Sequence, residues 1–414
     1  MSTTSGAVEP RLSGGEEHPP EQRRSPLGRW RDGIARALLV HRPRLLLVGP
    51  AVAYLAIRLL GLATLAWLAA VHHYTLDSRL EAWDGQWYVQ IAENNYSGVD
   101  PAMKDGYGHR YPETPLAFFP GYPVLARLVG ALVPGLSTTA AAVVVSFAAG
   151  VFAAYGLRRL TRWLGGSEKA GLLLVALFAA SPMAVVLSMA YSEALFCALS
   201  VWALVGVLER RWPLAGLCCA AAGLVRPTAS ALILVVGLAA LVAIYRRRDS
   251  WRPWLAAVLA PSGMIGYIGW VALETGKPNG YFELQRRGWS SSFDGGWSTL
   301  EFMIRTLALN RSALETITVW LVLGSVVLLV LCLRHRQPWP LVLFSAAVLV
   351  LDLGSDGLMY SKVRLMLPAF GLLVPVAIGL ANRRTTTAVA TTTLIVLFGS
   401  WFGAYSLTAW SYAI

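Results

Sequence analysis

The stretch ETITVWLVLGSVVLLVLCL, from Glu315 to Leu333, decides the fold class because its only charge is at its first position. A helix needs about 20 mostly apolar residues to cross a bilayer. The whole chain shares this character: 56% of its 414 residues are hydrophobic and 14% are charged, whereas soluble domains carry about 25% charged residues. The sequence therefore predicts an all-α, polytopic membrane protein without a sizeable soluble domain. Including this one, eleven spans are expected, near 45–71, 137–157, 169–190, 194–209, 213–225, 228–245, 254–273, 315–333, 339–354, 365–381 and 386–409.

Basic residues are concentrated in the short loops between alternate spans. Short cytoplasmic loops are rich in Lys and Arg, so this pattern places the N-terminus in the cytoplasm. The net charge of +12 then reflects membrane orientation, and no nucleic-acid partner is predicted. We expect a multi-pass protein of the cell (inner) membrane with extracytoplasmic loops at 72–136 and 274–314. The basic loops are 158–168, 209–212, 246–253, 334–338 and 382–385.

Two segments are expected not to span the membrane. Residues 1–44 are rich in Pro, Gly, Ser, Glu and Arg, which predicts a disordered, basic cytoplasmic tail ahead of a membrane domain at 45–414. The apolar run 116–134 is interrupted by prolines, so we expect a helix at the outer interface. The four cysteines lie within apolar runs, where they are interpreted as small buried hydrophobic residues.

Polar residues gather on the predicted outer side. Several separate loops contribute them, which indicates a site at the outer membrane surface. The alternative is that charges are simply tolerated at the ends of spans. The residues are Asp84, Glu113, Arg127, Glu193, Arg226, Glu274, Arg286, Lys362 and Arg364.

Two aromatic motifs occur in the first outer loop. The segment Trp83-Asp84-Gly85-Gln86-Trp87-Tyr88 places a carboxylate among aromatic residues, and Phe118-Phe119-Pro120-Gly121-Tyr122-Pro123 combines aromatic side chains with prolines that fix the backbone. Such aromatic residues can line a groove for a sugar or a lipid, and they can equally anchor the chain at the lipid headgroups. Both interpretations stay open at this point.

These motifs resemble those of the PIG-V-like mannosyltransferase family, one of the type C membrane glycosyltransferases. Further similar motifs follow in order up to Arg364, so the resemblance covers most of the chain after the tail. The eukaryotic members carry a His in the first motif where this chain has Trp87 or Tyr88, so the sugar and the acceptor do not carry over. The further motifs are Tyr191-Ser192-Glu193, Arg226-Pro227 and Gln285-Arg286-Arg287-Gly288-Trp289.

The resemblance implies transfer of a sugar from a polyprenyl-phosphate donor to a glycan, lipid or protein acceptor, with inversion at the anomeric carbon. Mannose is implied by the family alone. Asp84 matches the position of the catalytic carboxylate, and a carboxylate near the acceptor hydroxyl can act as a general base. The alternative role for Asp84 is to cap a helix that begins near Gln86.

The leaving phosphate requires cations, and the planar guanidinium group of arginine suits a phosphate best. Arg226 and Arg364 are the leading candidates, followed by Arg286 and Lys362. Glu193 and Glu113 are candidates for orienting these arginines or the acceptor. No cofactor is certain, and a divalent metal is left open, although no Asp-x-Asp pair supports one strongly. The expected groove or orienting residues are Trp83, Trp87, Tyr88, Glu113, Phe119, Tyr122, Tyr191, Glu193, Gln285 and Trp289.

One charge lies deep in a predicted span. Arg58 is near the middle of 45–71, where an unpaired charge is costly, so it should face the helix bundle. Asp352 is a candidate partner. Membrane lipids are expected around the chain. Two other functions are compatible with these residues: a flippase or transporter for a lipid-linked sugar, and a noncatalytic subunit of an envelope assembly complex.

The predicted orientation can be tested by cysteine labelling. Single cysteines at positions 100 and 290 should react with a membrane-impermeant reagent added outside intact cells. Cysteines at 160 and 248 should react only after permeabilisation, because basic loops are retained in the cytoplasm. Labelling of position 248 in intact cells would overturn this orientation.

Overall fold

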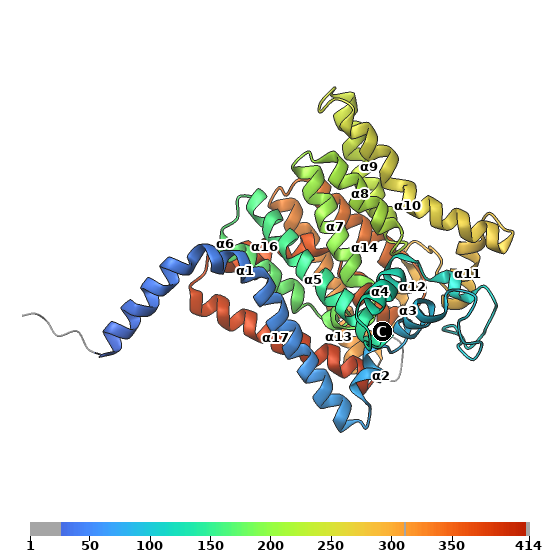
Figure 1. Cartoon of the computed structure of the whole chain (residues 1–414), viewed down its shortest axis with the longest axis horizontal. Coiled ribbons are helices and arrows are strands. Elements are labelled where there is room, and N and C mark those ends of the chain that lie inside the picture. The colour runs from blue at the N-terminus through green and yellow to red at the C-terminus, as the bar shows by residue number, and fades with distance from the viewer. Residues whose placement is uncertain (1–25, 310–311, 411–414) are drawn as a thin grey trace, which may run out of the picture. The chain divides into compact units, whose positions relative to one another are not determined.

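The computed structural model of the chain describes residues 26–309 and 312–410 and is helical throughout (Figure 1). Over these residues the only β-structure is one bridge between Phe293 and Ser355. The elements are α1 (Pro26–Val71), α2 (Leu76–Leu80), α3 (Asp84–Asn94), η1 (Thr114–Ala117), α4 (Gly121–Leu132), α5 (Thr138–Trp163), α6 (Glu168–Ala179), η2 (Ala184–Ser188), α7 (Glu193–Leu208), α8 (Trp212–Gly223), α9 (Ala229–Tyr245), α10 (Arg252–Thr275), α11 (Gly280–Trp289), α12 (Trp297–Ala308), α13 (Ala313–Arg334), α14 (Trp339–Leu353), η3 (Met359–Ser361), α15 (Lys362–Leu365), η4 (Phe370–Leu373), α16 (Val374–Ala381) and α17 (Thr385–Thr408).

The chain divides into two compact units, Met1–Leu47 and Val48–Ile414. Of the first unit only residues 26–47 are described, and they are helical as the first part of α1. The predicted disordered tail is therefore helical from Pro26 onward, in a segment rich in the helix formers Ala, Leu and Arg. The rest of that tail, 1–25, lies outside the described residues. All contacts discussed below belong to the second unit.

Five helices are long and apolar enough to cross a membrane. A sixth span is possible if the two helical segments 359–365 and 370–381, bent by 68° relative to each other, count together. The apolar helix α8 has 12 residues and reaches about 18 Å, which is shorter than the hydrocarbon core. The expected eleven spans are thus not confirmed. The long segments are Leu47–Val71, Thr138–Trp163, Arg252–Thr275, Ala313–Arg334 and Thr385–Thr408.

Prolines explain two of the differences from the expected spans. The expected span 169–190 is broken after α6, which ends at Ala179 just before Pro182. The expected span 365–381 is interrupted near Pro368, where α15 ends and η4 follows. Because proline lacks the backbone N–H and crowds the preceding turn, an apolar run that contains it need not form one continuous helix.

The middle of the second unit is built around α7, which is buried along most of its length. Helix α7 packs between α5 and α8, and α8 packs along α10 (Figure 1). The contact between α7 and α8 is close because Gly206 has no Cβ: a methyl group there would lie 2.8 Å from the backbone nitrogen of Ala215. The helix that carries Glu193 is therefore held by neighbours on several sides.

The first long loop is a folded layer attached to these helices. It contains α2, α3, η1 and α4, and their expected place at the membrane interface stays a prediction. Glu81 accepts a hydrogen bond from Thr139 in the first turn of α5, at 2.8 Å. The backbone nitrogens of Ala190 and Gly121 donate to the carbonyl oxygens of Leu80 and Leu224. These bonds fix α3 beside the start of α7.

Arg58 is 2% exposed, so it faces the protein as expected, but its predicted partner Asp352 is wrong. Its guanidinium donates to the hydroxyl of Ser188 at 2.9 Å and to the carbonyl of Ala179 at 2.7 Å. The end of α6 leaves this carbonyl without an intrahelical partner. The arginine therefore satisfies polar groups that are exposed by the break in the helix.

A glycine in α5 provides a test of this packing. A Cβ at Gly150 would overlap the hydroxyl of Tyr54 in α1, whereas a Cβ at Gly237 in α9 would meet no atom within 4 Å. Gly150→Ala should destabilise the protein by about 1–3 kcal/mol. Gly237→Ala should be neutral or stabilising by up to about 1 kcal/mol. Thermal unfolding in lipid nanodiscs measures both, and equal melting temperatures for the two variants would contradict the close approach of α1 and α5.

Candidate functional site

Asp84 is the first residue of α3, and the backbone before it is unusual. Trp83 has φ 59° and ψ −118°, a conformation that costs a bulky residue energy and that is found mostly at functional sites. The hydroxyl of Tyr191 holds this turn: it accepts from the backbone nitrogen of Asp84 at 3.2 Å and donates to the carbonyl of Ala82 at 3.0 Å. The helix starts at Asp84 itself, and its carboxylate points toward Arg364 instead of capping the backbone near Gln86.

Four charged side chains meet at this point. Nη1 of Arg364 donates to Oδ2 of Asp84 at 2.7 Å. The same nitrogen lies 3.5 Å from Oε1 of Glu193, and Nη1 of Arg226 lies 2.7 Å from that oxygen. We call Asp84, Arg364, Glu193 and Arg226 the charge cluster. Its members come from α3, α15, α7 and the turn between α8 and α9.

The charge cluster is deeply buried except at Asp84. The side chain of Glu193 is 1% exposed and that of Asp84 is 26% exposed. Nε of Arg364 and Oε2 of Glu193 are buried without a hydrogen-bond partner among the described residues. The cluster therefore keeps unused hydrogen-bonding capacity next to a carboxylate that solvent can reach.

Hydroxyl groups surround the arginines. The hydroxyl of Ser192 lies 2.9 Å from that of Tyr88 and accepts from Nη1 of Arg226 at 3.1 Å. The guanidinium of Arg364 lies over the ring of Tyr191 at 5.1 Å, a cation–π geometry. Burial raises the pKa of Tyr88 to about 12, so its hydroxyl keeps its proton. Ser192 was missed as a site residue, although it is the middle residue of the Tyr191-Ser192-Glu193 motif.

The other two predicted phosphate-binding cations lie in different surroundings. Nζ of Lys362 is buried and donates to the carbonyl oxygens of Asp352 and Ser355 at 2.6 and 2.7 Å. Both carboxylate oxygens of Asp352 are buried without a hydrogen-bond partner among the described residues. Lys362 therefore stands beside the cluster, two residues before Arg364. Arg286 is exposed on α11 and forms none of the ion pairs described for the cluster.

Most of the aromatic residues predicted to line a groove or to orient the substrate are buried in the packed core, and their role toward a substrate stays a prediction. Tyr122 is fully buried and donates to the carbonyl of Ala142 at 2.7 Å. Phe119 is 1% exposed and packs on Tyr267 with ring centroids 4.4 Å apart. Tyr191 is also fully buried. Burying these large rings stabilises the protein more than exposing them in a groove would.

The remaining predicted residues connect the first loop to α11. Trp87 stacks on Phe118 at 5.4 Å, and Trp289 meets the same ring edge-on at 5.4 Å. Nε2 of Gln285 donates to the carbonyl of Ala117 at 2.9 Å. Trp83 is partly exposed, so it is the predicted aromatic most accessible to a ligand. Glu113 precedes η1 as its N-cap residue and is half-buried there.

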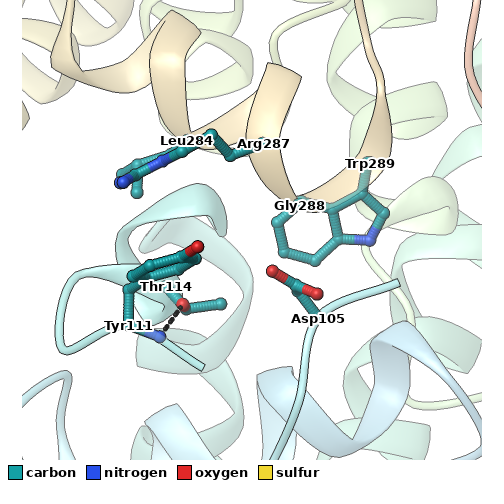
Figure 2. A pocket seen from close by; sticks show the side chains of 7 residues that line it. All are labelled: Asp105, Tyr111, Thr114, Leu284, Arg287, Gly288 and Trp289. Atoms are coloured by element: carbon teal, nitrogen blue, oxygen red, sulfur yellow. Dashed lines mark hydrogen bonds between the residues drawn. The ribbon is translucent and has the colours of Figure 1, made fainter. Parts of the chain in front are cut away.

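A small hollow lies where this loop meets α11 (Figure 2). Figure 2 shows the carboxylate of Asp105 pointing between Trp289 and Thr114. One carboxylate oxygen accepts from the backbone nitrogens of Tyr107 and His109. The other is buried without a hydrogen-bond partner in the described part of the chain. Asp105 was not predicted as a site residue, and its loop position carried no distinguishing signal.

Metal ligands do not gather anywhere in the described residues. No group of three or more His, Cys, Asp or Glu side chains is placed to hold a metal ion there. The carboxylates of Asp84 and Glu193 contact arginines.

Glu193 should be the residue on which the charge cluster depends most. Glu193→Ala would leave two buried arginines without their shared carboxylate, and breaking a buried ion pair from one side costs about 3–5 kcal/mol. The exposed Glu93 in α3 is the matched control, because Glu93→Ala should change stability by less than about 0.5 kcal/mol. Thermal unfolding in nanodiscs compares them, and a Glu193→Ala protein as stable as the control would refute the shared ion pair.

Comparison with curated proteins gives no match. Among solved structures, ArnT from Cupriavidus metallidurans bound to undecaprenyl phosphate is similar, with a TM-score of 0.52 and 16% identity over 84% of this chain and 62% of ArnT. The archaeal oligosaccharyltransferase AglB from Archaeoglobus fulgidus has a TM-score of 0.47 and 15% identity over 87% of this chain and 56% of AglB.

The chain thus spans less than two thirds of ArnT, and at this identity the likeness concerns the fold alone. ArnT shares the polytopic helical architecture that the apolar runs predict. The polytopic helical part of the expected type C membrane glycosyltransferase architecture is therefore supported. The finer resemblance to the PIG-V-like mannosyltransferases stays a prediction.

A family match decides the classification. The sequence profile of glycosyltransferase family 87 matches residues 119–361. This range is more than half of the chain and includes Glu193 and Arg226, although not Asp84 or Arg364. The chain belongs to glycosyltransferase family 87.

Proposed function

We propose that this membrane protein transfers a sugar from a polyprenyl-phosphate donor to a hydroxyl group of a glycan, lipid or protein acceptor at the outer face of the cell membrane. Mannose is the sugar that the motif resemblance favours. The observation that carries the proposal is the partly exposed carboxylate of Asp84, held 2.7 Å from a buried arginine that neighbours a second one. Family membership supports sugar transfer, and undecaprenyl phosphate bound to ArnT supports a lipid-linked donor.

Arg226 and Arg364 are proposed to bind the donor phosphate. Both guanidinium groups meet the same oxygen of Glu193, so a phosphate that approaches from the side of Asp84 can reach both. Nε of Arg364 has no partner among the described residues and is free to donate. Charge-assisted hydrogen bonds of this kind are shorter and stronger than neutral ones. Lys362, two residues away, adds a further positive charge to the phosphate side.

Asp84 is proposed as the general base. The acceptor hydroxyl attacks the anomeric carbon, a new bond forms between the acceptor oxygen and that carbon, and the bond from the carbon to the phosphate oxygen breaks. The hydroxyl proton goes to Asp84, and the bonding electrons leave with the phosphate. A single displacement from the face opposite the phosphate inverts the anomeric configuration, as in other one-step glycosyl transfers.

The pairing of Asp84 with Arg364 fits this charge movement. During the reaction Asp84 becomes neutral, while the lipid phosphate changes from a diester with one negative charge to a monoester that can carry two. The negative charge therefore moves from one side of Arg364 to the other. An arginine that contacts both groups can follow that charge with a small shift of its side chain. Glu193 serves as a positioning residue because it holds both arginines in place.

A flippase is the rival function, and Arg58, the charged residue deep in the first span, does not favour it. A transport path needs polar groups that a moving headgroup can use near the midplane. Arg58 instead donates to Ser188 and Ala179 of its own chain. This bonding explains Arg58 as a structural residue.

Asp84→Asn tests the proposed base. Asparagine keeps the shape and can still accept from Arg364, but it cannot take the proton, so transfer should fall by about 10²–10⁴-fold. Transfer is measured with purified full-length protein, radiolabelled mannosyl-phosphoryl-polyprenol and membrane acceptors, and donor binding is measured separately. Glu93→Gln, an exposed change on the same helix, should keep wild-type transfer.

The outcome distinguishes the two functions. Retained donor binding with lost transfer supports Asp84 as the base. A folded Asp84→Asn protein that transfers sugar at the wild-type rate would remove the proposed mechanism. Movement of the donor across a proteoliposome membrane without transfer would favour the flippase.

A further inference from the structure

A second hollow lies far from the charge cluster, at the other end of α5. Its volume is about 480 Å³, which is large enough for a lipid headgroup. Neither the proposed reaction nor the comparisons assign it a role. The residues that line it are Tyr155, Arg158, Arg159, Arg162, Trp163, Trp202 and Glu209.

The hollow and the charge cluster lie toward opposite ends of α5 and α7. The first turn of α5 is bonded through Thr139 to Glu81, next to α3, whereas the arginines of the hollow are in its last turns. The 26 residues of α5 extend over about 39 Å, enough to cross a bilayer. Helix α7 agrees, since Glu193 begins it and Glu209 follows its last residue.

The hollow has an excess of positive charge. Glu209 binds Arg159 through two hydrogen bonds of 2.6 and 2.7 Å, and Glu168 binds Arg158 at 2.7 Å. These hydrogen bonds lower the pKa of both glutamates, so both are ionised at neutral pH. With Arg162 and Arg211 included, four arginines face two glutamates, which leaves two positive charges without an acid of their own.

Arg162 is the most available cation of the hollow. Its side chain is 62% exposed, and its nearest acid, Glu168, is 3.5 Å away. Arg158 and Arg159, in contrast, are fixed by shorter bonds to their glutamates. An anion entering the hollow can therefore bind Arg162 without breaking the closer ion pairs.

An aromatic surface continues from the arginines toward the middle of the membrane. Phe152 is 48% exposed and stacks on Trp202 with ring centroids 5.0 Å apart. It precedes Arg159 by seven residues, which places it two turns away on the same side of α5, about 10 Å deeper. Trp163, also partly exposed, lies at the level of the arginines. Cations at the membrane surface with aromatic rings beneath them match a molecule that has an anionic head and an apolar tail.

We infer that this hollow, which we call the α5 arginine hollow, binds an anionic phospholipid of the leaflet opposite the charge cluster. The phosphodiester would contact Arg162 and the neighbouring arginines, and an acyl chain would lie along Phe152 and Trp202. A free phosphate ion would use only the arginines. The aromatic surface is therefore the observation that favours a lipid.

The test compares lipid binding by full-length protein in detergent, using native mass spectrometry with phosphatidylglycerol and phosphatidylcholine. The wild-type protein should retain phosphatidylglycerol in preference to phosphatidylcholine. Arg162→Glu should weaken phosphatidylglycerol binding at least about fivefold, the effect expected for one basic residue near an anionic lipid. Arg162 is exposed, so folding should be retained, and thermal unfolding in phosphatidylcholine nanodiscs verifies it.

Arg247→Glu is the matched control. Arg247 is an exposed arginine after α9, and its loop is bonded to the start of α8 through Asp249 and Trp212, so it belongs to the same face but not to the hollow. It should leave phosphatidylglycerol binding unchanged. Phe152→Ala keeps every charge and removes a ring proposed to contact the acyl chain. It should weaken the binding of phosphatidylglycerol without changing the weak binding of inorganic phosphate.

Three results would overturn the inference. The first is equal retention of the two lipids by the wild-type protein. The second is an equal loss in Arg247→Glu and Arg162→Glu, which would indicate general surface charge. The third is displacement of phosphatidylglycerol by millimolar inorganic phosphate, which would indicate a site for the free ion.

Discussion

The pairing of the Glu193 carboxylate with two arginines is the interaction on which the structure around the charge cluster depends. The carboxylate is 1% exposed and meets both Arg226 and Arg364, so three charges share a region of low dielectric. Charges in such a place are tolerated only when they are paired. Through Arg364 the pairing extends to Asp84, which is 280 residues distant in sequence. The first loop, α7, the α8–α9 turn and α15 must therefore all be in place before every one of these charges is paired.

Breaks in the helices make this assembly possible inside a membrane protein. Irregular backbone in a bilayer must be covered by protein or line a polar cavity. The break after α6 is satisfied by Arg58, which takes up the carbonyl of Ala179. The bend between α15 and α16 presents Lys362 and Arg364 from one short helix. In both cases a basic side chain is positioned where a regular helix is interrupted.

The sequence was sufficient to predict the membrane class. It was also sufficient to predict the residues of the charge cluster, because the loop charges and the order of motifs placed all four on one predicted side: Asp84, Glu193, Arg226 and Arg364. It was not sufficient for the number of spans, since average hydropathy does not register the hydrogen bonds lost around a proline such as Pro182. Nor could it separate the groove from the core: Tyr122 lies between Pro120 and Pro123 in either case. Only tertiary contacts show that its hydroxyl donates to the carbonyl of Ala142.

The balance of charges in and beside the charge cluster constrains how the proposed donor can bind. Arg226, Arg364 and Lys362 face the three carboxylates of Asp84, Glu193 and Asp352, so the site without substrate is neutral if all six are ionised. A phosphodiester adds a negative charge and shares Arg364 with Asp84, because Nε of that guanidinium has no partner among the described residues. Asp84 is the most exposed partner in the charge cluster, and it is also the group proposed to lose its charge by taking the acceptor proton. Proton transfer to Asp84 would therefore strengthen the interaction of Arg364 with the departing phosphate, at the moment when the phosphate gains negative charge. Base catalysis is thereby coupled to stabilisation of the leaving group.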